Sequence, residues 1–239
     1  MEEISEITAF FPTFNEESSL REVVEKAIGV LEKIAPKWEI IIVNDGSQDE
    51  TGKIAEKLAK KDRRIKVVHH SQNRGYGAAL KSGFYNAKYE WIVFTDADGQ
   101  FDFSQITKFI ETQRKTGADL VIGYYLKRKV SFLRVLGSKL LWEPAVFLLF
   151  GLKVKDIDCG FKLLKKEVIE KIPRLEAERG PFISSELLIK AKKLGFKIAE
   201  VEVHHYPRKA GRATGASLRV VLSGLVDLVK LRGRLINQI

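Results

Sequence analysis

The chain has 239 residues, of which 45% are hydrophobic and 30% are charged, so it is suited to one large globular domain and its composition excludes wholesale disorder. Its one cysteine, Cys159, excludes an intramolecular disulfide and fits a reducing, cytosolic setting. The net charge of +10 is concentrated in residues 127–155 and 206–239, which each hold seven basic residues against one acid and so indicate an anionic partner.

From residue 7 to residue 123, apolar runs alternate with segments of helical periodicity. Strands are predicted at 7–11, 38–43, 65–68, 91–95 and 120–122, and helices at 18–31, 51–61, 78–87 and 104–116. The strands are continuous apolar runs rather than alternating ones, which is typical of a sheet covered on both faces. The fold class predicted is therefore α/β, a mostly parallel sheet flanked by helices.

After residue 123 this rhythm changes. Helices are predicted at 130–150, with a break near Pro144, at 185–194 and at 218–234, and strands at 161–164 and 198–204. Neither an internal repeat nor a low-complexity linker divides the chain.

Polar residues follow four of the predicted parallel strands, where ligands of such sheets bind. Asp96 and Asp98 come directly after the strand at 91–95, and Gln100 follows them. Two carboxylates at this spacing suit one Mg²⁺ or Mn²⁺ ion, to which Gln100 would add a carbonyl oxygen. The alternative is a solvated turn, in which Asp and Gly are common.

The other strand ends each allow two interpretations. Asp45 would accept hydrogen bonds from a nucleotide base or ribose, or would form an Asx turn with Gly46 at positive φ. Residues 73–77 would bring backbone N–H groups or Arg74 to an anion, or would form a plain helix start. The adjacent pairs His69-His70 and His204-His205 lie at strand ends, where neighbours point to opposite faces, so a zinc site is not predicted.

Taken together and in order, these loops resemble family-2 glycosyltransferases of the GT-A fold. The resemblance covers residues 6–212 and is greatest to the polyprenyl-phosphate sugar transferases, such as the dolichyl-phosphate mannose synthases. It rests on Pro12–Glu16, Asn44-Asp45-Gly46-Ser47, Asn73-Arg74-Gly75 with Gly77 and Ala78, and Asp96-Ala97-Asp98-Gly99-Gln100. The segment Asp158-Cys159-Gly160-Phe161 is similar to the loop that precedes the family's sixth strand.

The resemblance implies roles for individual residues. It implies a base and ribose pocket made of Pro12, Phe14, Glu16, Val43 and Asp45. It implies a metal and diphosphate site made of Asp96, Ala97, Asp98 and Gln100, with Arg208 reaching the diphosphate. It also implies that Arg134 and Ser138, four residues apart and so on one face of a helix, hold the acceptor's phosphate.

The activity implied is an inverting, metal-dependent transfer of a sugar from GDP-mannose or a UDP-sugar to a dolichyl or undecaprenyl phosphate, with Mg²⁺ or Mn²⁺ as cofactor. One alternative acceptor is a sugar or protein hydroxyl, which would require a general base. Glu186 is the candidate for that base, unless it lies on the exposed face of its helix. A second alternative is a membrane-associated adaptor without catalytic activity.

The basic segments also predict where the chain works. Residues 127–152 and 218–234 interleave cations with apolar side chains, as amphipathic helices at an anionic lipid surface do. No apolar stretch reaches spanning length and no signal peptide is evident. We therefore expect a peripheral protein on the cytoplasmic face of a membrane, with a catalytic domain at 1–212 that includes interface helices at 127–152, and a basic amphipathic helix at 213–239.

The sequence leaves open whether a membrane protein is a partner. No nucleic-acid partner is expected, because no recognised nucleic-acid module accompanies the basic segments.

Overall fold

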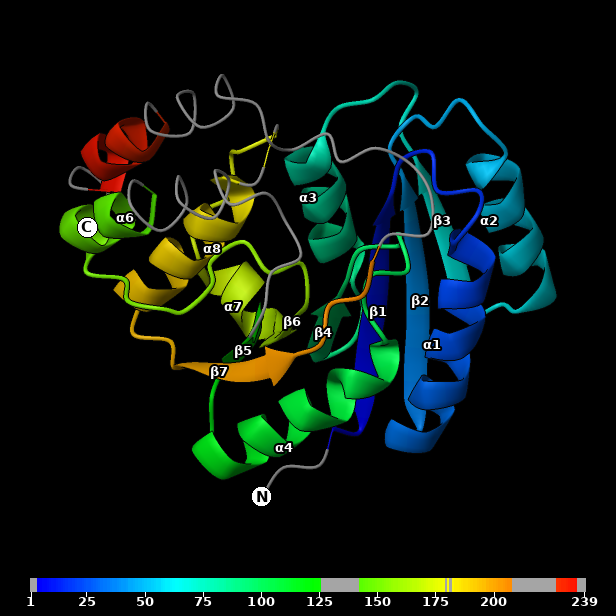
Figure 1. Ribbon diagram of the computed structural model, residues 1–239, viewed down its shortest axis with the longest axis horizontal. Helices are drawn as coiled ribbons and strands as arrows, with labels where there is room; N and C mark the ends of the chain where they lie inside the picture. The colour runs from blue at the N-terminus through cyan, green and yellow to red at the C-terminus, as the bar shows by residue number, and fades with distance from the viewer. Residues whose placement is uncertain (1–3, 126–141, 179, 181, 208–226, 236–239) are drawn as a thin grey trace.

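The computed structural model describes residues 4–125, 142–178, 180, 182–207 and 227–235. Within these ranges the chain forms a single sheet with helices on both of its faces (Figure 1). Arg134, Ser138, Arg208, most of the predicted interface segment and the predicted boundary at 212 lie outside the described residues.

Seven strands make up the sheet, in the order β3-β2-β1-β4-β6-β5-β7. Their bounds are β1 Glu6–Thr13, β2 Lys37–Asn44, β3 Ile65–His69, β4 Trp91–Phe94, β5 Leu120–Tyr125, β6 Lys162–Lys165 and β7 Ile198–Val203. All neighbouring pairs are parallel except those of β6, which runs antiparallel to both β4 and β5. The predicted mostly parallel sheet is confirmed, and β6 is its exception.

The central strands are apolar on both faces, and alternate residues feed two separate cores. On β1, Ile7, Ala9 and Phe11 belong to one buried cluster and Phe10 belongs to the other. Pro12 is tolerated near the end of β1 because β4 pairs only with residues 7–10 of that strand.

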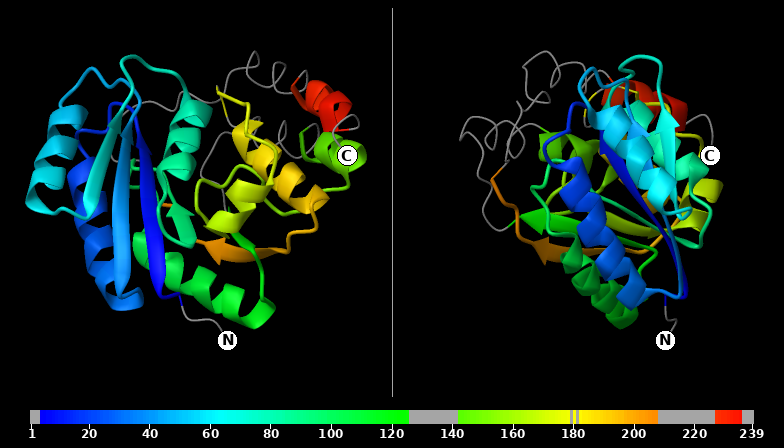
Figure 2. Two further views of the ribbon diagram at one scale, coloured as in Figure 1. Left: turned by 180° about the vertical axis from the view of Figure 1, so that it is seen from behind. Right: turned by 90° about the vertical axis from the view of Figure 1, so that its right-hand side faces the viewer.

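The helices divide between these two cores. Their bounds are α1 Leu20–Ile34, α2 Thr51–Lys61, α3 Tyr76–Asn86, the 3-10 turn η1 Phe103–Gln105, α4 Ile106–Thr116, α6 Glu143–Phe150, α7 Lys166–Lys171 and α8 Phe182–Lys193, and residues 227–235 are also helical. Buried side chains of α1, α2 and α4 belong to the first core, and those of α3, α6, α7, α8 and 227–235 belong to the second. Figure 2 shows the helices and the sheet from two further sides. The short α7 was not predicted, because its six residues bury only Val168 and Ile169 and show no period.

The helix α3 approaches β1 closely at Gly83. A methyl group at Gly83 would lie 2.3 Å from the ring of Phe10. That ring is fixed between Phe84 and Phe94, with centroids 5.1 and 5.2 Å away. Glycine at this position therefore sets the spacing between helix and sheet.

We expect Gly83→Ala to lower the free energy of unfolding by about 1–3 kcal/mol, because the added methyl overpacks a rigid aromatic cluster. Gly29→Ala in α1 is the matched control, since nothing lies within 4 Å of the new methyl. This control should gain about 0.5–1 kcal/mol from the lower chain entropy of alanine. Urea unfolding followed by circular dichroism measures both, and a Gly83→Ala variant as stable as the wild type would contradict the packing argument.

Candidate functional site

The loops after β1 and β2 are hydrogen-bonded to one another. The Thr13 hydroxyl donates to the Val43 carbonyl over 3.0 Å, and the Asp45 N–H donates to the Thr13 carbonyl over 2.9 Å. Further along, the Gln48 N–H donates to the Asn15 side chain over 2.9 Å, and Asn15 itself adopts a left-handed φ of 56°. The two strand ends therefore form one rigid platform.

The predicted base-pocket residues are distributed unevenly on this platform. Phe14 is exposed and Glu16 is half-buried, and the Ser19 hydroxyl donates to Glu16 Oε2 over 3.2 Å. Pro12 is buried, and Val43 is fully enclosed in the second core. The side chains of Phe14 and Glu16 are therefore the ones that this loop offers to a ligand.

Asp45 accepts hydrogen bonds from the start of α3. Its Oδ1 accepts from the Arg74 N–H over 2.9 Å, and its Oδ2 accepts from the Gly75 N–H over 2.8 Å. His70 Nδ1 lies 2.6 Å from Oδ1. Two of the backbone N–H groups that one interpretation of residues 73–77 offered to an anion thus bind the protein's own carboxylate.

The turn at Gly46 explains how the two loops come together. Gly46 has φ of 68°, and a methyl group there would lie 2.5 Å from the backbone nitrogen of Asn73. The side chain that binds the backbone of this turn is Asn44, whose Oδ1 accepts from the Ser47 N–H over 3.1 Å, and the oxygens of Asp45 accept from residues 70–75 instead. Asp45 is consequently left to hold residues 70–75.

Asp96 and Asp98 lie at the carboxyl end of β4, on either side of the buried Ala97. Asp96 Oδ1 accepts from the Tyr76 hydroxyl over 3.0 Å, and Asp98 Oδ1 accepts from the Gln100 N–H over 2.9 Å. Burial, and then the negative charges of Asp96 and Asp98, raise the pKa of Tyr76 well above its usual value. Both carboxylates therefore act on one phenol, which donates to Asp96.

Two residues that the sequence analysis had not connected with Asp96 lie next to it, namely Tyr76 and Gly160, and the buried Lys162 follows in the same segment as Gly160. A methyl group at Gly160 would lie 2.5 Å from Asp96 Oδ2, so only glycine lets the loop before β6 pass this carboxylate. Lys162 is fully buried and donates to the Cys159 carbonyl. Burial lowers the pKa of Lys162, while Cys159 and the carboxylates of Asp156, Asp158 and Asp96 act in the opposite direction.

Cys159 is a buried free thiol. Burial raises its pKa to about 12, so the sulfur stays protonated at neutral pH.

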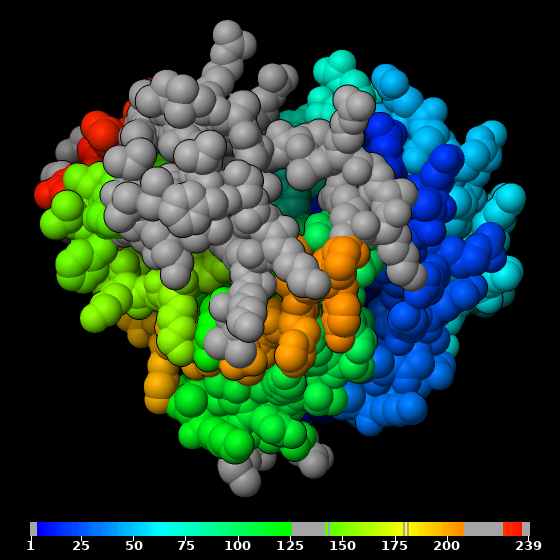
Figure 3. Space-filling model, in the orientation of Figure 1, coloured from blue at the N-terminus to red at the C-terminus, as the bar shows by residue number. Residues whose placement is uncertain are grey.

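Gln100 connects the acidic loop to the segment after β7. Its side-chain Nε2 donates to the Tyr206 carbonyl over 3.1 Å, and its backbone carbonyl accepts from the Tyr206 N–H over 2.8 Å. Gln105 binds both backbone groups of His204 with its side-chain amide, at 3.1 and 2.7 Å. In Figure 3, β7 and this segment (orange) lie on the surface next to α4 (green). Arg208 follows Pro207 and lies outside the described residues.

Glu186 is not on an exposed helix face, and that interpretation is wrong. It is 1% exposed and pairs with Lys190, with Oε1 at 2.6 Å from Nζ. Its carboxylate also accepts from the N–H groups of Glu176 and Ala177, over 2.9 Å each. This buried pair holds residues 176–178, which pack on Gly77 at the start of α3.

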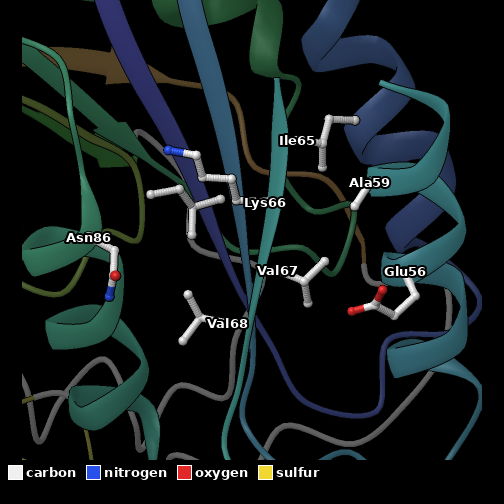
Figure 4. A pocket seen from close by; sticks show the side chains of 8 residues that line it. Glu56, Ala59, Ile65, Lys66, Val67, Val68 and Asn86 are labelled. Carbon is white, nitrogen blue, oxygen red and sulfur yellow. The ribbon is translucent and has the colours of Figure 1, made fainter. Parts of the chain in front are cut away.

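A cavity of about 440 Å³ lies elsewhere, beside the edge strand β3 (Figure 4). It is lined by residues of β2, α2, β3 and α3, among them Glu56, Lys66 and Asn86. None of the predicted site residues borders it, so it does not belong to the acidic loop. In the described part of the chain, no group of three or more His, Cys, Asp or Glu side chains is placed to bind a metal ion by itself.

Known proteins share this chain's sequence and fold. Residues 8–173 match the family model described as glycosyl transferase family 2. The polyprenol monophosphomannose synthase of Mycolicibacterium smegmatis is 31% identical over 94% of this chain and 86% of its own length. The dolichyl-phosphate beta-glucosyltransferase of Saccharomyces cerevisiae is 31% identical over 82% of this chain and 66% of its own. The chain spans 33% of a third relative, the glycosyltransferase AglD of Haloferax volcanii, at 28% identity.

Solved structures share the GT-A architecture. The glucosyl-3-phosphoglycerate synthase of Mycobacterium tuberculosis, crystallised with UDP, superimposes with a TM-score of 0.71 over 96% of this chain and 80% of its own, at 20% identity. Crystals of the same enzyme with UDP contain Mn²⁺ or Mg²⁺. With the ordered loops at the strand ends and the match over residues 8–173, the chain belongs to glycosyl transferase family 2.

Proposed function

We propose that this glycosyltransferase moves a sugar from a nucleotide diphosphate carrier to a polyprenyl phosphate, with inversion at the sugar carbon. The observation that carries the proposal is the carboxylate pair of Asp96 and Asp98, held at the end of β4 by Tyr76 and by the close passage of Gly160. The relatives named for transfer to dolichyl, polyprenol and undecaprenyl carriers support the acceptor class.

The donor set at this strand end fits a divalent cation. Carboxylate oxygens of Asp96 and Asp98 are hard ligands, and Gln100, whose backbone N–H donates to Asp98, carries an amide oxygen two residues further on. Because the protein supplies few ligands, positions stay open for diphosphate oxygens. When bound, Mg²⁺ or Mn²⁺ would offset the negative charge that grows on the leaving diphosphate.

The rest of the donor would lie on the platform beside this loop. Phe14 and Glu16 would meet the base and ribose from the first loop, with Pro12 and Val43 beneath them, and Asp45 would accept from the base. Arg208 would approach the diphosphate, because Gln100 and Gln105 hold the backbone that leads to it.

The network around Glu186 favours an acceptor that is already ionised. A hydroxyl acceptor needs a general base, and Glu186 is committed to Lys190 and to two backbone N–H groups. A phosphate monoester has a second pKa of about 6 and carries its nucleophilic charge at neutral pH. Such a group needs positioning rather than deprotonation, and we assign that task to Arg134 and Ser138.

Exposed apolar side chains on neighbouring helices support contact with a membrane. Leu148 on α6 is 77% exposed and Val229 on the helix at 227–235 is 65% exposed. The two helices adjoin, since the Arg232 guanidinium donates to the Leu149 carbonyl over 3.1 Å. They also contribute Val146, Leu228 and Leu231 to the protein's own core, so only part of their apolar surface is left for lipid. We place this surface on the cytoplasmic leaflet, where anionic lipid attracts basic segments.

None of the helices in the described ranges has both the length and the apolar character needed to cross a bilayer.

The function is tested by incubating the protein with labelled nucleotide sugars, a polyprenyl phosphate and Mn²⁺, and measuring label in the organic phase. We expect a lipid-soluble product that is abolished by EDTA and reduced at least 100-fold by Asp98→Asn, since charge stabilisation by one polar group is worth about 10²–10³ in rate. Transfer of the label to a water-soluble acceptor would contradict the proposal that the acceptor is a lipid. Undiminished turnover in the presence of EDTA would contradict the proposed requirement for a metal ion.

Gly160→Ala tests whether the position of Asp96 matters for binding. The new methyl would displace the Asp96 carboxylate, so we expect the affinity for nucleoside diphosphate to fall by about tenfold when Mn²⁺ is present. Calorimetry without Mn²⁺ is the comparison, in which wild type and variant should differ much less. Gly29→Ala controls for an added methyl, and equal Mn²⁺-dependent affinities in all three proteins would contradict the role of Asp96.

Flotation with vesicles tests the membrane surface. We expect the wild type to bind anionic vesicles at low salt and to dissociate as salt screens the basic segments. A Leu148→Ser and Val229→Ser double variant should bind more weakly, whereas Val30→Ser on α1 should bind as the wild type does. Equal binding by all of these proteins, or none by the wild type, would count against this surface.

A further inference from the structure

A hydrogen-bonded chain runs from Asp45 through His70 to Ser82. His70 Nδ1 lies 2.6 Å from Asp45 Oδ1, and His70 Nε2 lies 2.8 Å from the Ser82 hydroxyl. The side chains of His70 and Asp45 are 5% and 4% exposed. The preceding residue, His69, pairs instead with Glu56 on α2, so the two histidines point to opposite faces of the sheet. None of the site roles described above uses His70 or Ser82.

The chemistry of Asp45 fixes the direction of this chain. An ionised carboxylate only accepts hydrogen bonds, so the hydrogen between Asp45 and His70 is on Nδ1. The Ser82 hydroxyl pairs with Nε2 on the far side of the ring, over 2.8 Å. Ser82, on α3, therefore orients the ring that orients the carboxylate.

The hydrogen bonds of Asp45 leave little of its acceptor capacity. A carboxylate has about four acceptor positions, two on each oxygen. His70 and the Arg74 N–H occupy both positions of Oδ1, and the Gly75 N–H occupies one of Oδ2. Contacts from the described residues thus leave one position, on Oδ2.

We propose that His70 is a positioning residue that restricts Asp45 to a single hydrogen bond with the donor's base and so makes the site prefer uracil to guanine. This inference rests on the proposed function, in which Asp45 faces the base. Guanine presents two adjacent donors, N1–H and N2–H, which a carboxylate meets with both of its oxygens. Uracil presents one donor, N3–H, between two carbonyl oxygens that would repel a second carboxylate oxygen.

The arrangement also explains why a histidine is used here. Without the Nδ1–H donor, Oδ1 regains an open position and the carboxylate is free to turn toward a two-donor base. A merely structural histidine would affect folding but would not change the ratio of affinities for the two nucleotides. That ratio is therefore the measurement that separates positioning from packing.

The test is calorimetry with UDP and with GDP, each in the presence of Mn²⁺, on wild type and two variants. Asparagine places its amide nitrogen near the position of Nδ1 and glutamine near that of Nε2, so His70→Asn keeps the donor to Asp45 and His70→Gln loses it. We expect the wild type to bind UDP at least tenfold more tightly than GDP, as one unmatched polar group in a buried site requires. His70→Gln should weaken UDP binding about tenfold and bring the affinities for UDP and GDP closer together. His70→Asn should bind both nucleotides nearly as the wild type does.

Kinetics give a second readout, since His70→Gln should raise the KM for the nucleotide sugar while kcat at saturating donor changes little. Equal affinities or a preference for GDP in the wild type, or an unchanged ratio in His70→Gln, would overturn the inference and leave the proposed function standing. Binding of neither nucleotide by the wild type would overturn both. Should His70→Gln fail to fold, as judged by circular dichroism, the wild-type ratio and His70→Asn decide the matter.

Discussion

The acidic loop after β4 is held by groups that are distant in sequence and converge on it. Tyr76 donates to Asp96 from the start of α3, Gly160 passes against the same carboxylate from the loop before β6, and Tyr206 pairs with Gln100 from the segment after β7. Two carboxylates close together repel one another, so their positions depend on such external contacts. The proposed donor site depends on this convergence, because cation and diphosphate would bind only where both carboxylates stay in place.

A second convergence lies at the start of α3. Asp45 holds its backbone N–H groups from one side, and the segment fixed by Glu186 and Lys190 packs on Gly77 from the other. Buried ionic groups of this kind contribute little net stability, but removing one partner is costly. They specify a position, which here is that of Tyr76 and hence of Asp96. The base side and the metal side of the site are therefore connected through one helix end.

Much of the fold follows from local patterns, and much of the site does not. The bounds of α2 agree with the prediction to the residue, because its apolar positions repeat at helical spacing between clear polar boundaries. The antiparallel direction of β6 has no local signal, since its four residues, Lys-Leu-Leu-Lys, read the same in either direction. The acidic pair at 96 and 98 is visible in the sequence as a motif. The contacts of Tyr76, Gly160 and His70 are not, because each joins segments at least 12 residues apart. The exposed position that was one interpretation of Glu186 is wrong for a different reason. The burial of this side chain and its pairing with Lys190 depend on how the helix packs, which its sequence pattern does not reveal.

The hold of Gln100 and Gln105 on residues 204–206 has a consequence for how this protein tolerates change. Both glutamines bind main-chain atoms: Gln105 uses its side-chain amide for both bonds, and Gln100 uses its side-chain nitrogen and its own backbone carbonyl. Since every amino acid except proline presents the same N–H and C=O, the identities of residues 204 and 206 are irrelevant to this grip. Natural variation can therefore remodel the outward surface there, and with it the contacts made with different substrates, while the path of the backbone stays the same.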